Sequence, residues 1–262
     1  MAVLQVIGGG RMGEALVGGL LAAGTAAAEV RVVEPLDARR KELHDLLPDV
    51  EVTAEPGPAD GTVIAVKPGD VPSACRAAAA AGSGRVLSIA AGVTIASLEA
   101  ALAPGTAVVR AMPNTPALVR QGAAAIAPGT SAGEDDLSWA ESLLGAVGTV
   151  VRVAEPLLDA VTGLSGSGPA YVFLVAEALI DAGVLAGLPR DISSRLSIQT
   201  LVGAATLLAE GDQGPEALRA AVTSPGGTTA AGLRTLEQHG VRAAFLEAVA
   251  AATERSRQLG AT

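Results

Sequence analysis

The sequence predicts an α/β fold in which a doubly wound sheet in the N-terminal half precedes an all-helical C-terminal half. Over roughly the first 150 residues, short runs of β-branched side chains alternate with stretches that carry apolar residues at helical spacing. A glycine-rich turn joins the first run to the first helical stretch, and strand-like runs disappear after about Val153. Regular alternation of strands and helices is typical of a parallel sheet covered by helices.

Six β-branched runs, each bounded by Gly, Pro or Asp, predict the strands of this sheet. They are residues 3–8, 29–34, 61–68, 85–90, 106–113 and 149–153. The predicted helices between them carry apolar side chains three and four residues apart. These helices are residues 11–24, 37–47, 70–81 and 94–102.

Four long helical stretches make up the C-terminal half: residues 169–183, 191–211, 228–240 and 241–259. The first is apolar almost all round and is interrupted only by Glu177 and Asp181, so it should be buried on most faces. A unit of about 110 residues offers little interior for such a helix. We therefore expect a homodimer formed through the helical half, with higher assembly left open.

Composition limits the class of protein. A net charge of −9 argues against a nucleic-acid or anionic-membrane surface. The single cysteine, Cys75, cannot form an internal disulfide or build a zinc site, and we interpret it as a helix-packing residue. We expect no metal. Acidic residues or Gly and Pro interrupt every apolar stretch before about 18 residues accumulate, and no signal peptide is visible, so we expect a cytoplasmic protein that spans no membrane.

The stretch "VIGGGRMG" follows the first predicted strand and opens the first helix. It places Gly8, Gly10 and Gly13 at the spacing of the Rossmann dinucleotide fingerprint, with Arg11 and Met12 between them. The first glycine allows the tight turn, the second admits a pyrophosphate and the third lets helix and strand pack closely. The pattern predicts binding of NADH or NADPH at the helix N-terminus.

Glu34 ends the second predicted strand about 20 residues beyond the fingerprint. A carboxylate there binds a ribose 2′-hydroxyl and repels a 2′-phosphate, which slightly favours NADH. Arg11, Arg39 and Arg40 oppose this reading, because any of them has the charge to neutralise a phosphate. The coenzyme preference stays open at the level of sequence.

Two further loops follow predicted strands, at the sheet edge where doubly wound folds bind ligands. In "IAVKPGD", Val66, Lys67 and Pro68 are candidates to line the nicotinamide pocket, although a solvated lysine is the plain alternative. In "RAMPNTPALV", two prolines flank Asn114 and Thr115 and stiffen a turn. Its polar side chains either bond a ligand or only stabilise the turn.

The stretch "VTSPGGTTAAGL" predicts an anion site in the helical half. Successive backbone N–H groups of Gly226, Gly227, Thr228 and Thr229 form a nest at a helix start, which suits a carboxylate. Ordinary N-caps by the threonines are the alternative reading. Neither of the two histidines resembles a positioned general acid, and the helical half has no lysine. A protonated imine accepts hydride with less help than a ketone, so these residues suit reduction of a C=N bond.

In "GGGRMG", "AVKP", "RAMPNTP", "LSGSGPAYVF" and "TSPGGTTAAGL", in that order and spacing, the chain resembles the Δ1-pyrroline-5-carboxylate reductases over essentially its whole length. The resemblance implies a dinucleotide-binding Rossmann domain over residues 1–153. It also implies a helical substrate-binding and dimerisation domain over residues 154–262. The implied reaction is NAD(P)H-dependent reduction of a cyclic imine to L-proline, the last step of proline biosynthesis.

The resemblance also implies roles for individual residues. The carboxylate of the substrate would lie on Ser224 and the amides of residues 226–229, and Thr229 would bond the ring nitrogen as the catalytic residue. Ser165 and Gly168 would begin the helix that floors the imine pocket. The coenzyme-contacting loops would contribute Val66, Lys67, Pro68, Met112, Pro113 and Asn114. Glu34 departs from the small polar or basic residues of many relatives, which puts their usual NADPH preference in doubt.

Two other readings compete. A β-hydroxyacid dehydrogenase relative would share the two-domain layout, but such enzymes use a lysine on the first helix of the second domain, which this chain lacks. A nicotinamide-sensing binding module would keep the fingerprint but would have no use for the turn at residues 224–229.

Overall fold

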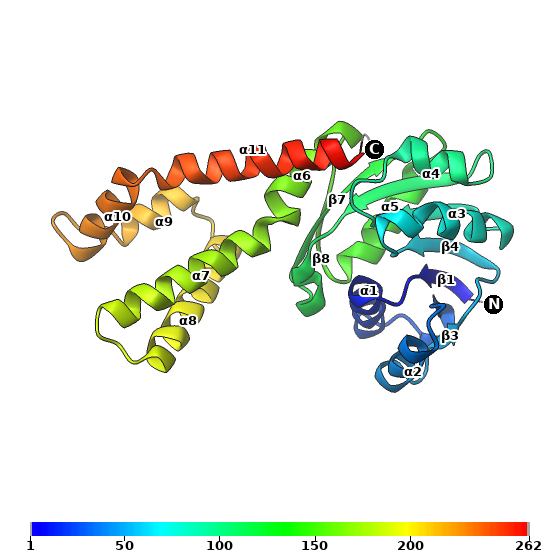
Figure 1. Ribbon diagram of the computed structural model, residues 1–262, viewed down its shortest axis with the longest axis horizontal. Coiled ribbons are helices and arrows are strands. Elements are labelled where there is room, and N and C mark those ends of the chain that lie inside the picture. Colours follow the sequence, from blue (N-terminus) through cyan, green and yellow to red (C-terminus); the bar gives the residue numbers. More distant parts are fainter. Residues whose placement is uncertain (1, 261–262) are drawn as a thin grey trace. The chain divides into compact units, whose positions relative to one another are not determined.

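The computed structural model describes residues 2–260 and places an eight-stranded sheet in its N-terminal part (Figure 1). The strand order is β3-β2-β1-β4-β5-β6-β7-β8. The strands are β1 (Ala2–Ile7), β2 (Val30–Val33), β3 (Glu51–Thr53), β4 (Ala59–Ile64), β5 (Arg85–Ser88), β6 (Ala107–Met112), β7 (Gly122–Pro128) and β8 (Gly148–Arg152). β1 lies between β2 and β4 and pairs parallel with both, so the order in which strands are added reverses at β1, as in doubly wound folds. This confirms the predicted class.

Helices cover both faces of the sheet. On one face, α1 (Arg11–Ala22), α2 (Asp37–Leu46) and α5 (Glu134–Gly145) bury apolar side chains against Val6 and its neighbours. On the other face, α3 (Val71–Ala80) and α4 (Ile95–Ala101) pack against Ile7 and its neighbours. Adjacent residues of one strand thus serve two cores, because successive strand side chains point to opposite faces. Cys75 is fully buried in the second core, as expected of a packing residue.

One pair of strands differs from the predicted parallel arrangement. β6 and β7 pair antiparallel, with Val109 opposite Pro128, whereas β7 and β8 are parallel again. The connection between β6 and β7 contains only the short 3₁₀ turn η3 (Thr115–Val119). A parallel neighbour needs a crossover of a dozen or more residues, so a chain that returns this soon must pair antiparallel.

The described residues form two compact units. One contains residues up to Ser167 together with the chain from Ala250 onward, and the other is Gly168–Val249. The predicted change from strands to helices is confirmed, since β8 ends at Arg152 and the following elements are helical. The assignment of separate domains to residues 1–153 and 154–262 stays a prediction.

The second unit is built from α7 (Gly168–Leu185), α8 (Arg190–Glu210), α9 (Pro215–Ala221), α10 (Thr228–Gln238) and the first part of α11 (Val241–Gly260). α7 and α8 lie side by side (Figure 1) and are tied by the Ser193 hydroxyl, which donates to the carbonyl of Ile180 at 2.7 Å. A methyl group at Gly183 would overlap this hydroxyl, so the glycine permits the close contact.

Within residues 2–260, α7 has no buried residue and α8 buries only Ser193. Large apolar side chains on the two helices are open, including Val172, Phe173, Leu174, Leu185, Leu196, Val202 and Leu207. By length and composition alone, segments 155–185 and 190–210 would suffice to cross a membrane. The burial expected for residues 169–183 is therefore not supplied by the described part of the chain, and an apolar surface this large marks an interaction site.

Candidate functional site

The turn after β1 has the geometry of a dinucleotide fingerprint. Gly8 adopts a positive φ of 109°, which side chains disfavour, and a β-carbon there would lie 2.6 Å from the carbonyl oxygen of Ala65. A β-carbon on Gly13 would overlap the carbonyl oxygen of Gly8, so only glycine lets α1 approach the strand. In front of Gly10, by contrast, the space is open to 4 Å. A ligand can therefore approach the backbone of the turn at Gly10.

The N-terminus of α1 is open toward this space. Its N-cap is Gly10, and among residues 2–260 no side chain caps the helix. Arg11 is exposed at the first helical position, while Met12 packs partly against the core. Free N–H groups and the positive end of the helix dipole suit a pyrophosphate, so the residues present fit a dinucleotide.

Glu34 and Arg39 hold this turn through contacts that the sequence does not predict. The N–H of Gly9 donates to Oε2 of Glu34 at 3.1 Å, and Nε of Arg39 donates to the carbonyl of Gly9 at 2.7 Å. A β-carbon on Gly9 would overlap Leu43 and crowd Glu34. The sequence carried one signal for this close packing, the run of three consecutive glycines. The fingerprint requires only the first and third of them, so the second glycine needed another explanation.

The carboxyl ends of β1, β2 and β4 converge at this turn. The N–H of Gly8 bonds the carbonyl of Val33 at 2.8 Å, and Ala65 bonds the carbonyl of Ile7 at 2.8 Å. Val66 lies against the turn, with Cγ1 3.0 Å from the position of a β-carbon on Gly8. The next two residues, Lys67 and Pro68, are exposed. The structure therefore brings Gly8, Glu34 and Val66 together.

A second group forms at the end of β6, around Asn114. Its side-chain oxygen accepts from the N–H of Ala123 at 2.8 Å, and its Nδ2 donates to the carbonyl of Ser165 at 3.0 Å. Ser165 lies in the π-helical turn η5 (Thr162–Gly166), a geometry often found at functional sites. The Ser165 hydroxyl donates to the carbonyl of Val161 at 3.1 Å. Asn114 thus fixes one loop against another.

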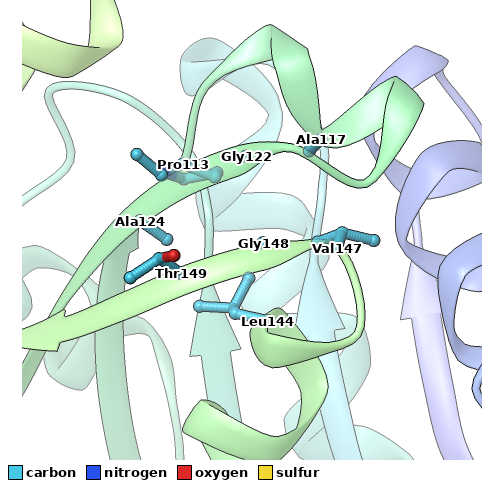
Figure 2. Close-up of a pocket in the computed structure, with 9 residues that line it drawn as sticks. Pro113, Ala117, Gly122, Ala124, Leu144, Val147, Gly148 and Thr149 are labelled. Atoms are coloured by element: carbon cyan, nitrogen blue, oxygen red, sulfur yellow. The ribbon is translucent and has the colours of Figure 1, made fainter. Parts of the chain in front are cut away.

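Met112 belongs to the same group, because a β-carbon on Gly166 would lie 2.6 Å from its Cε. Pro113 is buried and lines a small pocket between η3, α5, β7 and β8 (Figure 2). The pocket measures about 160 Å³ with its solvent-open space included. This is below the range of about 300–1,000 Å³ that is usual for ligand sites. We interpret it as a packing gap behind the loop.

The stretch at residues 224–227 forms a type II turn. The N–H of Gly227 bonds the carbonyl of Ser224 at 3.0 Å, with Pro225 at the second position and Gly226 at the third with a φ of 73°. Pro and Gly at these positions are what this turn requires. A β-carbon on Gly227 would overlap the Ser224 hydroxyl, which therefore lies directly on the glycine backbone.

α10 starts directly after this turn with Gly227 as its N-cap, so Thr228 and Thr229 are the first two helical residues. The alternative in which the threonines are N-caps is therefore excluded. In the described part of the chain, no side chain caps this N-terminus. The nest belongs to the unit 168–249, whereas the fingerprint, the 66–68 loop, Asn114 and Ser165 belong to the other unit.

The described residues offer little for metal binding or for thiol chemistry. Among residues 2–260 there is no group of three or more His, Cys, Asp and Glu side chains able to hold a metal ion. Burial raises the pKa of the Cys75 thiol to about 11, which suppresses the nucleophilic thiolate.

Two known families match separate parts of the chain. Residues 3–92 match the family described as NADP oxidoreductase, coenzyme F420-dependent. Residues 155–259 match the family described as pyrroline-5-carboxylate reductase dimerisation.

Full-length relatives are similar to the whole chain. The pyrroline-5-carboxylate reductase of a Synechocystis species is 46% identical, covering 98% of this chain and 98% of its own. That of Corynebacterium melassecola is 42% identical, covering 99% of each. Among solved structures, a pyrroline-5-carboxylate reductase from Coxiella burnetii superposes with a TM-score of 0.94 at 35% identity, covering 100% of this chain and 99% of its own. A Plasmodium falciparum pyrroline carboxylate reductase with NADP bound gives 0.86 at 30% identity, covering 99% and 98%.

Proposed function

The chain belongs to the pyrroline-5-carboxylate reductase family, and we propose how its residues carry out the reduction of 1-pyrroline-5-carboxylate to L-proline. The observation that carries the proposal is the pair of open helix N-termini. One follows the fingerprint and the other follows the turn at residues 224–227. Each offers backbone N–H groups to an anionic group, and the two reactants each carry one, the pyrophosphate of the coenzyme and the carboxylate of the imine.

The coenzyme-binding residues lie at the carboxyl edge of the sheet. The N-terminus of α1, with Gly8, Gly10, Arg11, Met12 and Gly13, takes the pyrophosphate, and Glu34 takes the adenine ribose. The backbone of Val66, Lys67 and Pro68 and the loop of Met112, Pro113 and Asn114 line the nicotinamide pocket. The fixed position of Val66 against the fingerprint and of Asn114 against Ser165 supports this division. When bound, NADH or NADPH supplies the hydride.

The substrate-binding residues lie at the start of α10. The amides of Gly226, Thr228 and Thr229 hold the carboxylate, and the hydroxyl of Ser224 adds a hydrogen bond from the edge of the nest. The amide of Gly227, which the sequence also predicts to bind the carboxylate, instead closes the turn on the carbonyl of Ser224. Thr229 is the catalytic residue, and its hydroxyl bonds the ring nitrogen. Ser165 lines the imine pocket and, because its own proton is donated to Val161, accepts a hydrogen bond from the substrate.

Hydride adds to the carbon of the C=N bond, the electron pair of that bond moves to nitrogen, and nitrogen carries one proton in from solution. Because a protonated imine is already electrophilic, the protein does not have to donate a proton in the hydride-transfer step. Orientation of the ring by Thr229 and the nest then supplies most of the catalysis.

The helical half supports a homo-oligomer, and we propose a homodimer built on α7 and α8, with higher assembly open. The exposed apolar side chains of Phe173, Leu174 and Leu196 support this arrangement. A negatively charged chain whose one thiol is buried fits a cytoplasmic enzyme with no nucleic-acid or membrane partner.

The experiment is to follow nicotinamide absorbance with 1-pyrroline-5-carboxylate present and absent, using each coenzyme. Oxidation that needs the imine and yields L-proline in equal amount is expected. A chain that binds a nicotinamide but oxidises neither coenzyme in the presence of the imine would contradict the proposal and restore the binding-module reading.

A further inference from the structure

We infer that Glu34 makes this enzyme select NADH over NADPH, and that the arginines beside it do not offset the selection. The inference rests on the proposed function of the fingerprint and concerns only which nicotinamide it takes. Sequence alone left the question open, because Arg11, Arg39 and Arg40 all lie near the fingerprint or Glu34 in the chain.

The Glu34 carboxylate is built into the coenzyme loop. The residue is 8% exposed, and its two oxygens accept from the backbone N–H groups of Gly9 at 3.1 Å and Leu36 at 2.9 Å. In this fold the adenine ribose lies beside the end of the second strand. A carboxylate has about four acceptor positions, so the two that remain suit the 2′-hydroxyl of NADH. A 2′-phosphate brings more negative charge and no proton to donate.

The guanidinium of Arg39 is already bound to other groups of the protein and is not free to bind a 2′-phosphate. Its Nε donates to the carbonyl of Gly9 at 2.7 Å, and its two terminal nitrogens form ion pairs with Glu14 and Glu42. These hydrogen bonds and charges raise the pKa of Arg39, so the pairs stabilise its charged form. Two carboxylates and one carbonyl thus hold the guanidinium against the fingerprint turn.

The guanidinium of Arg40 is already bound as well. Its Nη1 donates to the carbonyls of Glu34 at 2.9 Å and Pro35 at 2.7 Å, and its Nη2 pairs with Asp37 at 3.2 Å. Lys41 also pairs with Asp37, at 3.0 Å. A 2′-phosphate would have to break these contacts before any of the three cations became available to it.

Arg11 is the remaining arginine. It is exposed at the first position of α1, and none of the ion pairs formed among residues 2–260 includes it. We assign it to the pyrophosphate, which both coenzymes share, because the first helical turn is where that group binds. It therefore contributes equally to both affinities.

Titration calorimetry with NAD⁺ and NADP⁺ tests the inference without turnover. The wild-type protein should bind NAD⁺ more tightly than NADP⁺. Glu34→Gln removes the charge and keeps an acceptor for one of the two backbone N–H groups. It should shift the ratio of the two dissociation constants toward NADP⁺ by about tenfold or more, and its melting temperature checks that the loop is still folded. Glu51→Gln is the matched control, because Glu51 pairs with Arg31 at the opposite end of the neighbouring strand, and its ratio should equal that of the wild type.

Two further variants test the arginines. Arg39→Met and Arg11→Met should each weaken both coenzymes by the same factor, and thermal melting checks that each variant is folded. An arginine variant that weakens NADP⁺ alone would identify a 2′-phosphate ligand and overturn the inference. So would a wild-type protein that binds NADP⁺ at least as tightly as NAD⁺. In either case a protein that still reduces the imine retains the proposed function, so the two failures are distinguishable.

Discussion

Thr229 differs from the threonines inside the helices of its unit in what its hydroxyl contacts. Thr200, Thr206 and Thr235 each donate to the carbonyl four residues earlier, at 2.7, 2.9 and 3.2 Å. Thr229 is the second residue of α10, and in the described chain its hydroxyl makes no such bond. A hydroxyl that is not bound to its own helix is available to a ligand, which is the physical basis for its proposed role.

Thr229→Ala should lower kcat/KM for the imine by about 10- to 100-fold. This factor corresponds to the free energy of one hydrogen bond to a charged group. Thr229→Ser should keep most of the activity, because it retains the hydroxyl. Thr235→Ala is the control and should leave turnover unchanged, because the Thr235 hydroxyl is hydrogen-bonded within its own helix. Steady-state kinetics with melting temperatures decides the matter, and full turnover by Thr229→Ala would remove the residue from the mechanism.

Glycine identity at the start of α1 is set by the approach of backbone to backbone. Gly13 faces the carbonyl oxygen of Gly8, which no rotamer change can move, whereas Gly18 on the same helix faces open space. The two glycines therefore have opposite effects on stability. One is required for helix and turn to meet, and the other only weakens the helix.

Gly13→Ala should destabilise the protein by about 1–3 kcal/mol, as overpacking does, and should abolish tight coenzyme binding by pushing α1 off the turn. Gly18→Ala should stabilise it by about 0.5–1 kcal/mol, because alanine is the better helix former. Denaturant unfolding of the two variants gives both numbers. Equal effects from the pair would mean that the packing described for Gly13 is wrong.

Elements with clear periodicity were predictable, and those without it were not. The β-branched runs that became β1, β2 and β6 and the amphipathic run that became α1 were read correctly. β7 was missed, since its sequence GAAAIAP is alanine-rich and lacks β-branched side chains apart from Ile126. The strand β3 and the helices α5 and α9 were missed as well.

The candidate site shows the same limit. Motif residues such as Gly8, Glu34 and Asn114 were found from local pattern. The contacts that explain them were not, because Gly9 with Arg39 and Asn114 with Ser165 are 30 and 51 residues apart in the chain. Contacts of that separation depend on tertiary packing, which a single sequence does not display.

At the scale of the whole molecule, the helical unit is incomplete as a single chain. α7 and α8 expose a run of Val, Leu and Phe side chains, yet the chain carries a net charge of −9 that favours solubility. Burial of such a surface against a second copy gives about 25 cal/mol for each Å² of apolar area covered. Folding of this unit and association of two chains should therefore be linked.

Phe173→Glu, on the exposed face of α7, should dissociate the proposed homodimer and lower the melting temperature, because it places a charge in an apolar contact. Val151→Glu is the control, as Val151 is also about half exposed but lies on β8. Sedimentation velocity at several concentrations reads out the change. A Phe173→Glu protein that sediments as the wild type does would exclude this face from the interface.

In the proposed mechanism, the nest at residues 226–229 holds the carboxylate of the substrate while the fingerprint holds the coenzyme. A crystal structure with NAD⁺ and L-proline tests it most directly. The proline carboxylate should lie about 3 Å from the backbone nitrogens of the nest, with the ring nitrogen bonded to Thr229. The reacting carbon should lie about 3–3.5 Å from the nicotinamide. Proline bound anywhere else beside an occupied coenzyme site would contradict this mechanism.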